Sequence, residues 1–258
     1  MNAQLPLAAV EWQAPPGVQA LITMRAGGVS AAPMDTLNLA THVGDAPEAV
    51  QENRRRLRVA ADLPSEPRWL RQVHGIAVAD LDAQSPGSEP EADAAVTTRA
   101  GTVCAVLTAD CLPVLFTASD GSAVAVAHAG WRGLAAGVLD RTVAALRARV
   151  AAGVALLSWI GPAIGVRHFE VRDDVRQAFL DADPHNAVAF ARGRDGHWQC
   201  DLPYLARRRL AALDVAGIGG SECCTYAEEA RFFSHRRDVQ HRGCPTTGRM
   251  AALIWRQA

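Results

Sequence analysis

The chain has 258 residues and a formal net charge of −1, with 26 Lys and Arg against 27 Asp and Glu. This balance gives no basic excess for nucleic-acid binding, and 49% hydrophobic with 21% charged residues excludes an intrinsically disordered chain. No run of 18 strongly apolar residues and no leader-like N-terminus is present, so we expect no membrane association and a cytoplasmic location.

The first third of the chain predicts two strands and one helix. "QALITMR" (19–25) reads as a strand that enters a glycine turn, and "GIAVADLD" (75–82) reads as a second strand. Between them, Asp45 is the predicted N-cap of a helix, with Pro47 in the first turn and Glu48 completing a capping box. The segment 83–91 is rich in Pro, Ser and Gly and predicts a loop.

The rest of the chain alternates apolar strands with amphipathic helices. Strands are predicted at 103–107, 112–116 and 123–128, with a hairpin turn at 119–122. Apolar residues at helical spacing predict a helix over 133–150. Further predicted elements are a strand from 156 into a glycine-rich turn, helices at 173–184 and 201–217, and a strand at 249–255. The second of these helices is capped by Asp201 and ends near Gly217.

The order of these elements is mixed and does not follow strict βαβ alternation. No repeat or linker interrupts the chain. We therefore predict one domain over 1–258 of the mixed α/β class, a sandwich of packed sheets flanked by helices.

Three residues at strand ends form a candidate metal site. Cys111 in "TADC" and His128 in "HAGWRG" are 17 positions apart, and His74 lies in "RQVHG" at the mouth of another predicted strand. Three protein ligands that leave one position open suit a catalytic zinc, whereas structural zinc usually shows CxxC-type spacing. For any one of the three, a buried thiol or a hydrogen-bonded core histidine is the alternative.

Zinc lowers the pKa of bound water to about 7, and the resulting hydroxide can attack a ring carbon that bears an amine. This chemistry needs a proton shuttle beside the metal. Asp110 is the carboxylate nearest in sequence to a ligand, and its alternative role is to cap a turn.

Arginine next to glycine recurs along the chain and suggests anion binding. Arginine recognises phosphate in a bidentate manner, and glycine-rich turns expose backbone N–H groups. The candidates are Arg25, Arg132, Arg236, Arg237 and Arg249, each of which could equally be a surface or ion-pair residue. Trp131, Tyr226, Phe232 and Phe233 could stack on a planar base or pack in the core. Cys223 and Cys224 are read as buried thiols.

Several motifs occur in a fixed order along nearly the whole chain, and together they resemble the YfiH family, also called the laccase-domain or polyphenol oxidase family. The motifs include "TMRAGGVS", "LNLATHVGD", "QVHG", "ADAAVTT", "TADCLPVLF", "HAGWRG" and "FFSHRRD…TGRMA". The resemblance implies a single-domain cytoplasmic protein with an α/β sandwich similar to the catalytic domain of cytotoxic necrotizing factor.

The resemblance also implies a zinc ion held by His74, Cys111 and His128, phosphorolysis of adenosine, inosine, guanosine and methylthioadenosine, and deamination of adenosine. Some members are described as copper-dependent phenol oxidases. We assign catalysis to Cys111, His74 and Asp110. Binding of purine nucleoside and phosphate is assigned to Arg25, Asn38, His42, Arg132 and Phe233. A monomer or a homodimer is expected. One departure from the family pattern is the apparent insertion "VQHRGCPT" (239–246), which separates "RRD" from "TGR".

Two other functions stay open at this point. Cys111 could be a thiolate nucleophile with a histidine base in a metal-independent hydrolase or amidase. The other open function is a multicopper phenol oxidase. Against it, the eight histidines of the chain include no HxH pair. A blue-copper centre also needs two histidines and a cysteine with a weak axial ligand.

Overall fold

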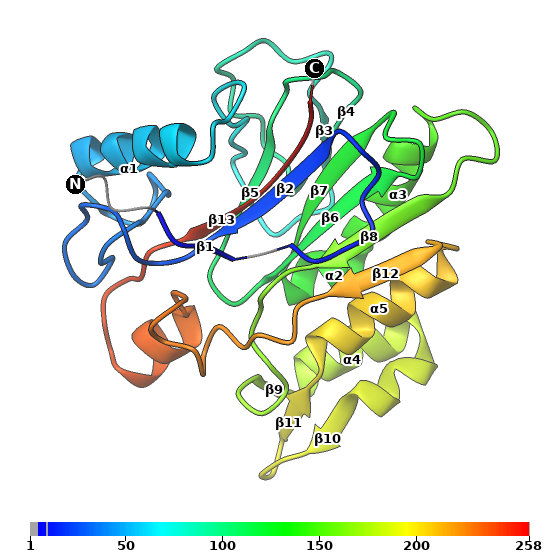
Figure 1. Cartoon of the computed structure of the whole chain (residues 1–258). Coiled ribbons are helices and arrows are strands. Elements are labelled where there is room, and N and C mark those ends of the chain that lie inside the picture. Colours follow the sequence, from blue (N-terminus) through cyan, green and yellow to red (C-terminus); the bar gives the residue numbers. More distant parts are fainter. Residues whose placement is uncertain (1–4, 9, 258) are drawn as a thin grey trace.

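Two β-sheets lie face to face at the centre of the computed structural model, which describes residues 5–8 and 10–257 (Figure 1). Helices and loops cover the outer face of each sheet. The α/β sandwich of packed sheets that the sequence predicts is therefore confirmed.

The larger sheet has six strands in the order β12-β8-β6-β7-β4-β3. In chain order the strands are β3 (Val78–Asp80), β4 (Ala94–Thr97), β6 (Leu112–Ala118), β7 (Val124–Ala129), β8 (Leu156–Ile160) and β12 (Gly217–Gly220). β6 and β7 form the predicted hairpin, and Gly121 adopts a positive φ of 72° in its turn. All residues of β4, β6 and β7 are buried, which explains their short, continuous apolar sequences.

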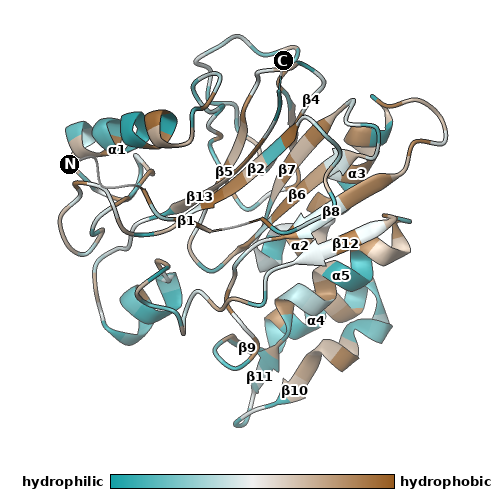
Figure 2. Cartoon of the chain, viewed as in Figure 1, coloured by the Kyte–Doolittle hydropathy of each residue, from teal (hydrophilic) through white to brown (hydrophobic). Residues whose placement is uncertain are grey.

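The smaller sheet of the sandwich has four strands in the order β1-β2-β13-β5. The strands are β1 (Leu7–Ala8), β2 (Val18–Thr23), β5 (Cys104–Thr108) and β13 (Met250–Arg256). β13 pairs with both β2 and β5, so the C-terminal segment lies in the middle of this sheet. Figure 2 shows that central strands such as β6, β7 and β8 are among its most hydrophobic segments.

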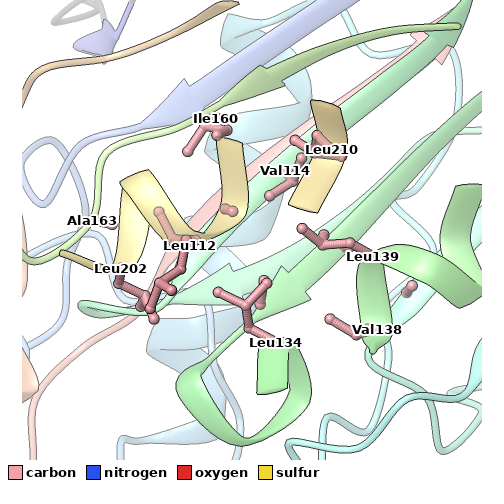
Figure 3. Packing of buried hydrophobic residues seen from close by; sticks show 14 of the residues in the cluster. Leu112, Val114, Leu134, Val138, Leu139, Ile160, Ala163, Leu202 and Leu210 are labelled. Atoms are coloured by element: carbon pink, nitrogen blue, oxygen red, sulfur yellow. The ribbon is translucent and has the colours of Figure 1, made fainter. Parts of the chain in front are cut away.

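Helices from the second half of the chain cover the larger sheet. They are α2 (Trp131–Ala136), α3 (Val138–Arg147), α4 (Asp173–Ala182) and α5 (Leu202–Ala212). Leu134, Leu139 and Leu202 from these helices meet Leu112 and Val114 of β6 in one buried cluster (Figure 3). The smaller sheet is covered by α1 (Pro47–Ala60) and by loop residues.

Three predicted helix boundaries differ from the structure. The helix expected over 133–150 is two helices, because Gly137 adopts a φ of 99° between α2 and α3. α1 has Ala46 and not Asp45 at its N-cap, since the Asp45 carboxylate accepts hydrogen bonds from Ser30 and Asn38 in the preceding loop.

α5 begins at the predicted cap, where Asp201 accepts a hydrogen bond from the Tyr204 N–H. It ends at Ala212 and not near Gly217, which begins strand β12. A small third sheet, absent from the sequence prediction, is made of β9 (Glu170–Arg172), β10 (Phe190–Arg192) and β11 (His197–Cys200). The remaining helical segments are a 3₁₀ turn at Pro184–Ala189 and a π-helical turn at Arg236–His241. Within the described residues, no helix is both long enough and apolar enough to cross a membrane.

Because Leu139 is fully buried between α3 and the larger sheet, Leu139→Ala should lower the free energy of unfolding by about 2–5 kcal/mol. Val59→Ala, at a position of α1 that is 61% exposed, should change it by less than about 0.5 kcal/mol. Urea unfolding of both variants measures this. Similar losses at the two sites would contradict the layer assignment.

Candidate metal centre and active site

The three predicted metal ligands meet at one end of the larger sheet. Cys111 immediately precedes β6, His128 lies in β7, and His74 lies in the loop before β3. Antiparallel pairing sets Pro113 opposite His128, so the start of β6 lies beside the end of β7. The candidate ligand atoms of the three residues all lie within 4.8 Å of one another.

The separation of these groups suits a shared ion more than direct bonding. The Cys111 Sγ to His74 Nε2 distance is 3.9 Å, and the two imidazole rings lie edge to face with centroids 4.8 Å apart. Thiolate and imidazole are the usual ligands of zinc, and three of them leave a position for a further ligand.

A buried aspartate that the sequence analysis did not single out holds two of the ligands in place. Asp93 is fully buried and immediately precedes β4. Its carboxylate accepts a hydrogen bond from His128 Nδ1 at 2.8 Å and from the N–H groups of Val73, His74 and Gly75 at 2.6–3.1 Å. Burial alone would raise the pKa of Asp93, but the hydrogen bonds from His128 and Gly75 lower it, so the group is a carboxylate.

This contact also decides which nitrogen of His128 faces the cluster. With Nδ1 bonded to Asp93, Nε2 is the ring nitrogen left for a metal ion, as in carboxylate–histidine–metal arrangements. The only sequence signal for Asp93 is an acidic residue inside the small apolar segment "ADAAVTT".

The Cys111 side chain is set up to be a thiolate. Burial alone would raise the pKa of its thiol, but His128 and His74 outweigh that effect and lower the pKa. Burial likewise favours neutral His128, while Cys111 and Asp93 raise its pKa. Thiolate character is what both a metal ligand and a nucleophile require.

A glycine keeps the space around the ligands open. A Cβ atom at Gly130, in "HAGWRG", would lie 2.9 Å from His74 Cδ2 and 3.0 Å from Cys111 Sγ. Any larger residue would therefore displace a ligand. The donor set, the Asp93 contact and this cradle together fit a bound metal ion.

Asp110 lies beside the cluster, but its carboxylate is engaged elsewhere. It accepts hydrogen bonds from Thr225 Oγ1 at 2.7 Å, Ser234 Oγ at 3.0 Å and the Arg236 N–H at 2.7 Å. The Asp110 backbone has a φ of 88°, a conformation that is rare outside glycine and that tertiary contacts must enforce. The arrangement favours a residue that orients Cys111 over a free proton shuttle.

A pocket of about 390 Å³ opens over the cluster, within the size range of small-molecule sites. Its polar lining combines the three ligands with Asp110 and with His42, Gln72, Arg132, His235, Arg236, Gln240 and Arg249. Its apolar lining includes Trp131, Ile164 and Phe169.

The structure brings only some of the predicted substrate residues to this pocket. His42 and Arg132 line it, whereas Arg25, Asn38 and Phe233 do not. Phe233 is fully buried in a small cluster with Phe232. Arg25 packs over the Phe233 ring and pairs with Asp35 at 3.4 Å.

Asn38 is also fully buried, and it acts on the pocket indirectly. Its Oδ1 accepts a hydrogen bond from the backbone N–H of Arg249 at 3.0 Å. The Arg249 guanidinium lies in the pocket and donates to the carbonyls of Thr247 and Gly248. No carboxylate in the described part of the chain lies within 4.0 Å of it, and burial lowers its pKa. A partly buried cation without a carboxylate partner is suited to an anionic ligand.

A separate, larger pocket of about 960 Å³ lies away from the metal cluster, between α3, α4 and α5. Two of its arginines are already paired, Arg208 with Asp183 and Arg209 with Asp140. It contains none of the metal-site residues, so we place the chemistry in the smaller pocket.

Comparisons with known proteins show the family of the chain. Residues 19–257 match the family described as multi-copper polyphenol oxidoreductase laccase. The chain belongs to this laccase-domain family. Members include the Escherichia coli purine nucleoside phosphorylase YfiH, 49% identical over 95% of this chain and 96% of that protein, and a Pseudomonas aeruginosa purine nucleoside phosphorylase, 47% identical over the full length of both.

Solved structures give the same result. A Neisseria meningitidis protein superposes with a TM-score of 0.88 at 44% identity, covering 99% of this chain and 100% of that one. YlmD from Geobacillus stearothermophilus superposes with a TM-score of 0.85 at 34% identity over 99% of both chains. The laccase-domain fold thus accounts for nearly the whole chain.

Asp93→Asn should weaken metal binding about 10–100-fold, because an amide has one acceptor oxygen where the carboxylate has two and cannot orient both His128 and the 73–75 loop. Competition with a chromophoric chelator measures the affinity. Asp82→Asn is the control, since Asp82 accepts hydrogen bonds from Thr97 and Thr98 at the other end of β4. Equal effects of the two substitutions would contradict the role of Asp93.

Proposed function

We propose that the chain is a zinc-dependent purine nucleoside phosphorylase that also deaminates adenosine. The observation that carries the proposal is one pocket that contains both the His74–Cys111–His128 cluster and the Arg249 guanidinium, which has no carboxylate partner among the described residues. The names of relatives at about half identity over almost the whole chain support its phosphorylase part. The proposed substrates are adenosine, inosine, guanosine and methylthioadenosine with inorganic phosphate, acted on in the cytoplasm by a monomer or homodimer.

In phosphorolysis, the bond between the sugar C1′ and the base nitrogen breaks, a phosphate oxygen bonds to C1′, and the base leaves with a proton. Arg249 is our candidate to hold the phosphate, with His42 close by in the same pocket. Burial and the charge of Arg249 lower the pKa of His42, so its imidazole is neutral and can share a proton with the phosphate. Trp131 and Phe169 offer apolar walls for the planar base.

Zinc would be held by His74, Cys111 and His128 and would supply Lewis-acid chemistry at the floor of the pocket. Zinc is favoured over copper because the described residues contain a single cluster of three His, Cys, Asp or Glu ligands, whereas a multicopper oxidase needs several centres. Deamination of adenosine would use the same cluster, with water as the nucleophile and ammonia as the product. Asp110, Asn38, Arg25 and Phe233 then act as positioning residues around the pocket.

A second candidate function also has a specific observation in its favour. Cys111, His128 and Asp93 form a thiol–imidazole–carboxylate series, which is the arrangement of a cysteine hydrolase. This enzyme would need no metal. Its activity would survive chelators and be lost on alkylation of the thiol.

The zinc proposal predicts that purified enzyme carries about one zinc per chain and releases adenine or hypoxanthine from adenosine in a phosphate-dependent manner. Cys111→Ala should abolish both zinc retention and turnover, whereas Cys244→Ala, in the 239–246 insertion, should preserve them. Metal analysis and product chromatography test this. A chelator-resistant activity that iodoacetamide destroys would favour the cysteine hydrolase.

The choice of phosphate residue makes a separate prediction. Arg249→Gln should raise the KM for phosphate at least about tenfold, since a hydrogen bond between charged groups is lost. Arg25→Gln should change it less, because Arg25 is paired with Asp35 outside the pocket. Arg167→Gln, an exposed position outside the pocket, is the control for charge alone. A larger effect at Arg25 would return the assignment to the sequence-based candidate.

A further inference from the structure

The metal pocket continues into a second cavity. A pocket of about 430 Å³ shares four lining residues with it, namely Trp131, Phe169, Arg236 and Gln240. The two cavities are therefore neighbours that share these four side chains. A ligand seated over the metal cluster could extend past them into the second cavity.

The second cavity carries an excess of positive charge. Arg172, Arg194 and Arg236 line it, against Glu170 and Asp174. Glu170 pairs with Arg194 at 2.8 Å. Two histidines that can donate hydrogen bonds, His197 and His241, complete its polar lining.

The wall formed by the four shared side chains contains a cation, Arg236, without a carboxylate partner among the described residues. The Arg236 guanidinium donates to the carbonyl oxygens of Glu170 at 2.8 Å and His168 at 3.4 Å, and it lies over the Phe169 ring. No carboxylate in the described residues lies within 4.0 Å of its guanidinium, and Arg172 likewise takes part in no ion pair there. Arg236 is partly buried and Arg172 is exposed at the cavity, and arginines without a carboxylate partner are suited to a phosphate group.

The other side of the wall is built by the insertion in this chain. Gln240 and His241 belong to the π-helical turn Arg236–His241, the end of which lies in segment 239–246. The turn is fixed by a hydrogen bond between His241 and Tyr226 at 2.9 Å and by a paired contact of Arg242 with Glu229. These contacts place Gln240 and His241 at the wall of the cavity, and single π-helical turns are frequent at functional sites.

We propose that the second cavity is a subsite for a phosphate monoester carried by the substrate, so that the enzyme takes nucleoside monophosphates in addition to nucleosides. The inference rests on the proposed function for the placement of the nucleoside over the metal cluster. The nucleoside lies in the first cavity, and its phosphate passes Arg236 and Gln240 to reach Arg172.

The test compares inosine with inosine 5′-monophosphate, binding to the zinc-loaded enzyme in phosphate-free buffer. Without phosphate neither compound undergoes phosphorolysis, so calorimetry gives equilibrium constants. We expect the monophosphate to bind about tenfold more tightly, the size of one charge-assisted hydrogen bond. Arg172→Glu should remove this preference and leave inosine binding unchanged. Arg192→Glu, an exposed position on β10 outside the cavity with the same change of charge, should keep it.

Equal affinities of the wild type for inosine and inosine 5′-monophosphate would overturn the subsite. The same loss of preference in Arg172→Glu and Arg192→Glu would overturn it as well. Turnover of inosine with phosphate but no preference for the monophosphate would overturn the subsite and leave the proposed function standing. A preference that depends on Arg172 in an enzyme without phosphorolysis would support the subsite and contradict the proposed reaction. If Arg172→Glu instead raises the KM for inorganic phosphate, the cavity serves the free co-substrate and the inference is wrong. Binding of neither compound would contradict both proposals.

Discussion

The carboxylate of Asp93 is the contact on which the site depends. It accepts a hydrogen bond from Nδ1 of His128, the ligand in β7. It also accepts hydrogen bonds from three backbone N–H groups of the loop that carries His74, so it joins the two segments. A buried carboxylate is costly unless such donors surround it. Because all of its donors belong to the ligand-bearing segments, the same contacts that stabilise Asp93 fix the geometry of the metal centre.

The sandwich supplies the rest of that geometry. Pairing of β6 with β7 sets Cys111 beside His128, and the buried faces of both strands leave no freedom to slip by a residue. Arg249 immediately precedes β13, the strand that pairs with both β2 and β5 in the smaller sheet. Asn38 accepts a hydrogen bond from the Arg249 backbone N–H and so fixes its position. The pocket thus takes its metal ligands from one end of the larger sheet and the loop before β3, and its candidate phosphate residue from the start of β13, a central strand of the smaller sheet.

The strands and the ligand set could be predicted because both are local. Continuous apolar runs mark β5, β6 and β7, and cysteine and histidine at strand ends mark the site whatever the topology. Errors arose where a distant residue competed for a side chain: Asp45 bonds Ser30 and Asn38 and so leaves the α1 cap to Ala46. Gly137, read as part of one helix, divides it because its left-handed conformation ends α2.

The sequence by itself determined the α/β class, the β6–β7 hairpin and the candidate ligands His74, Cys111 and His128, because hydrophobic period and residue chemistry carry that information locally. Only the tertiary structure decided which polar residues accompany them. Arg25 precedes two glycines and Arg249 follows one, yet Arg25 is paired with Asp35 outside the pocket and Arg249 lines it. Asp93 becomes part of the site only when strand pairing brings residue 93 to 74 and 128, since no spacing in the sequence encodes the distance between them.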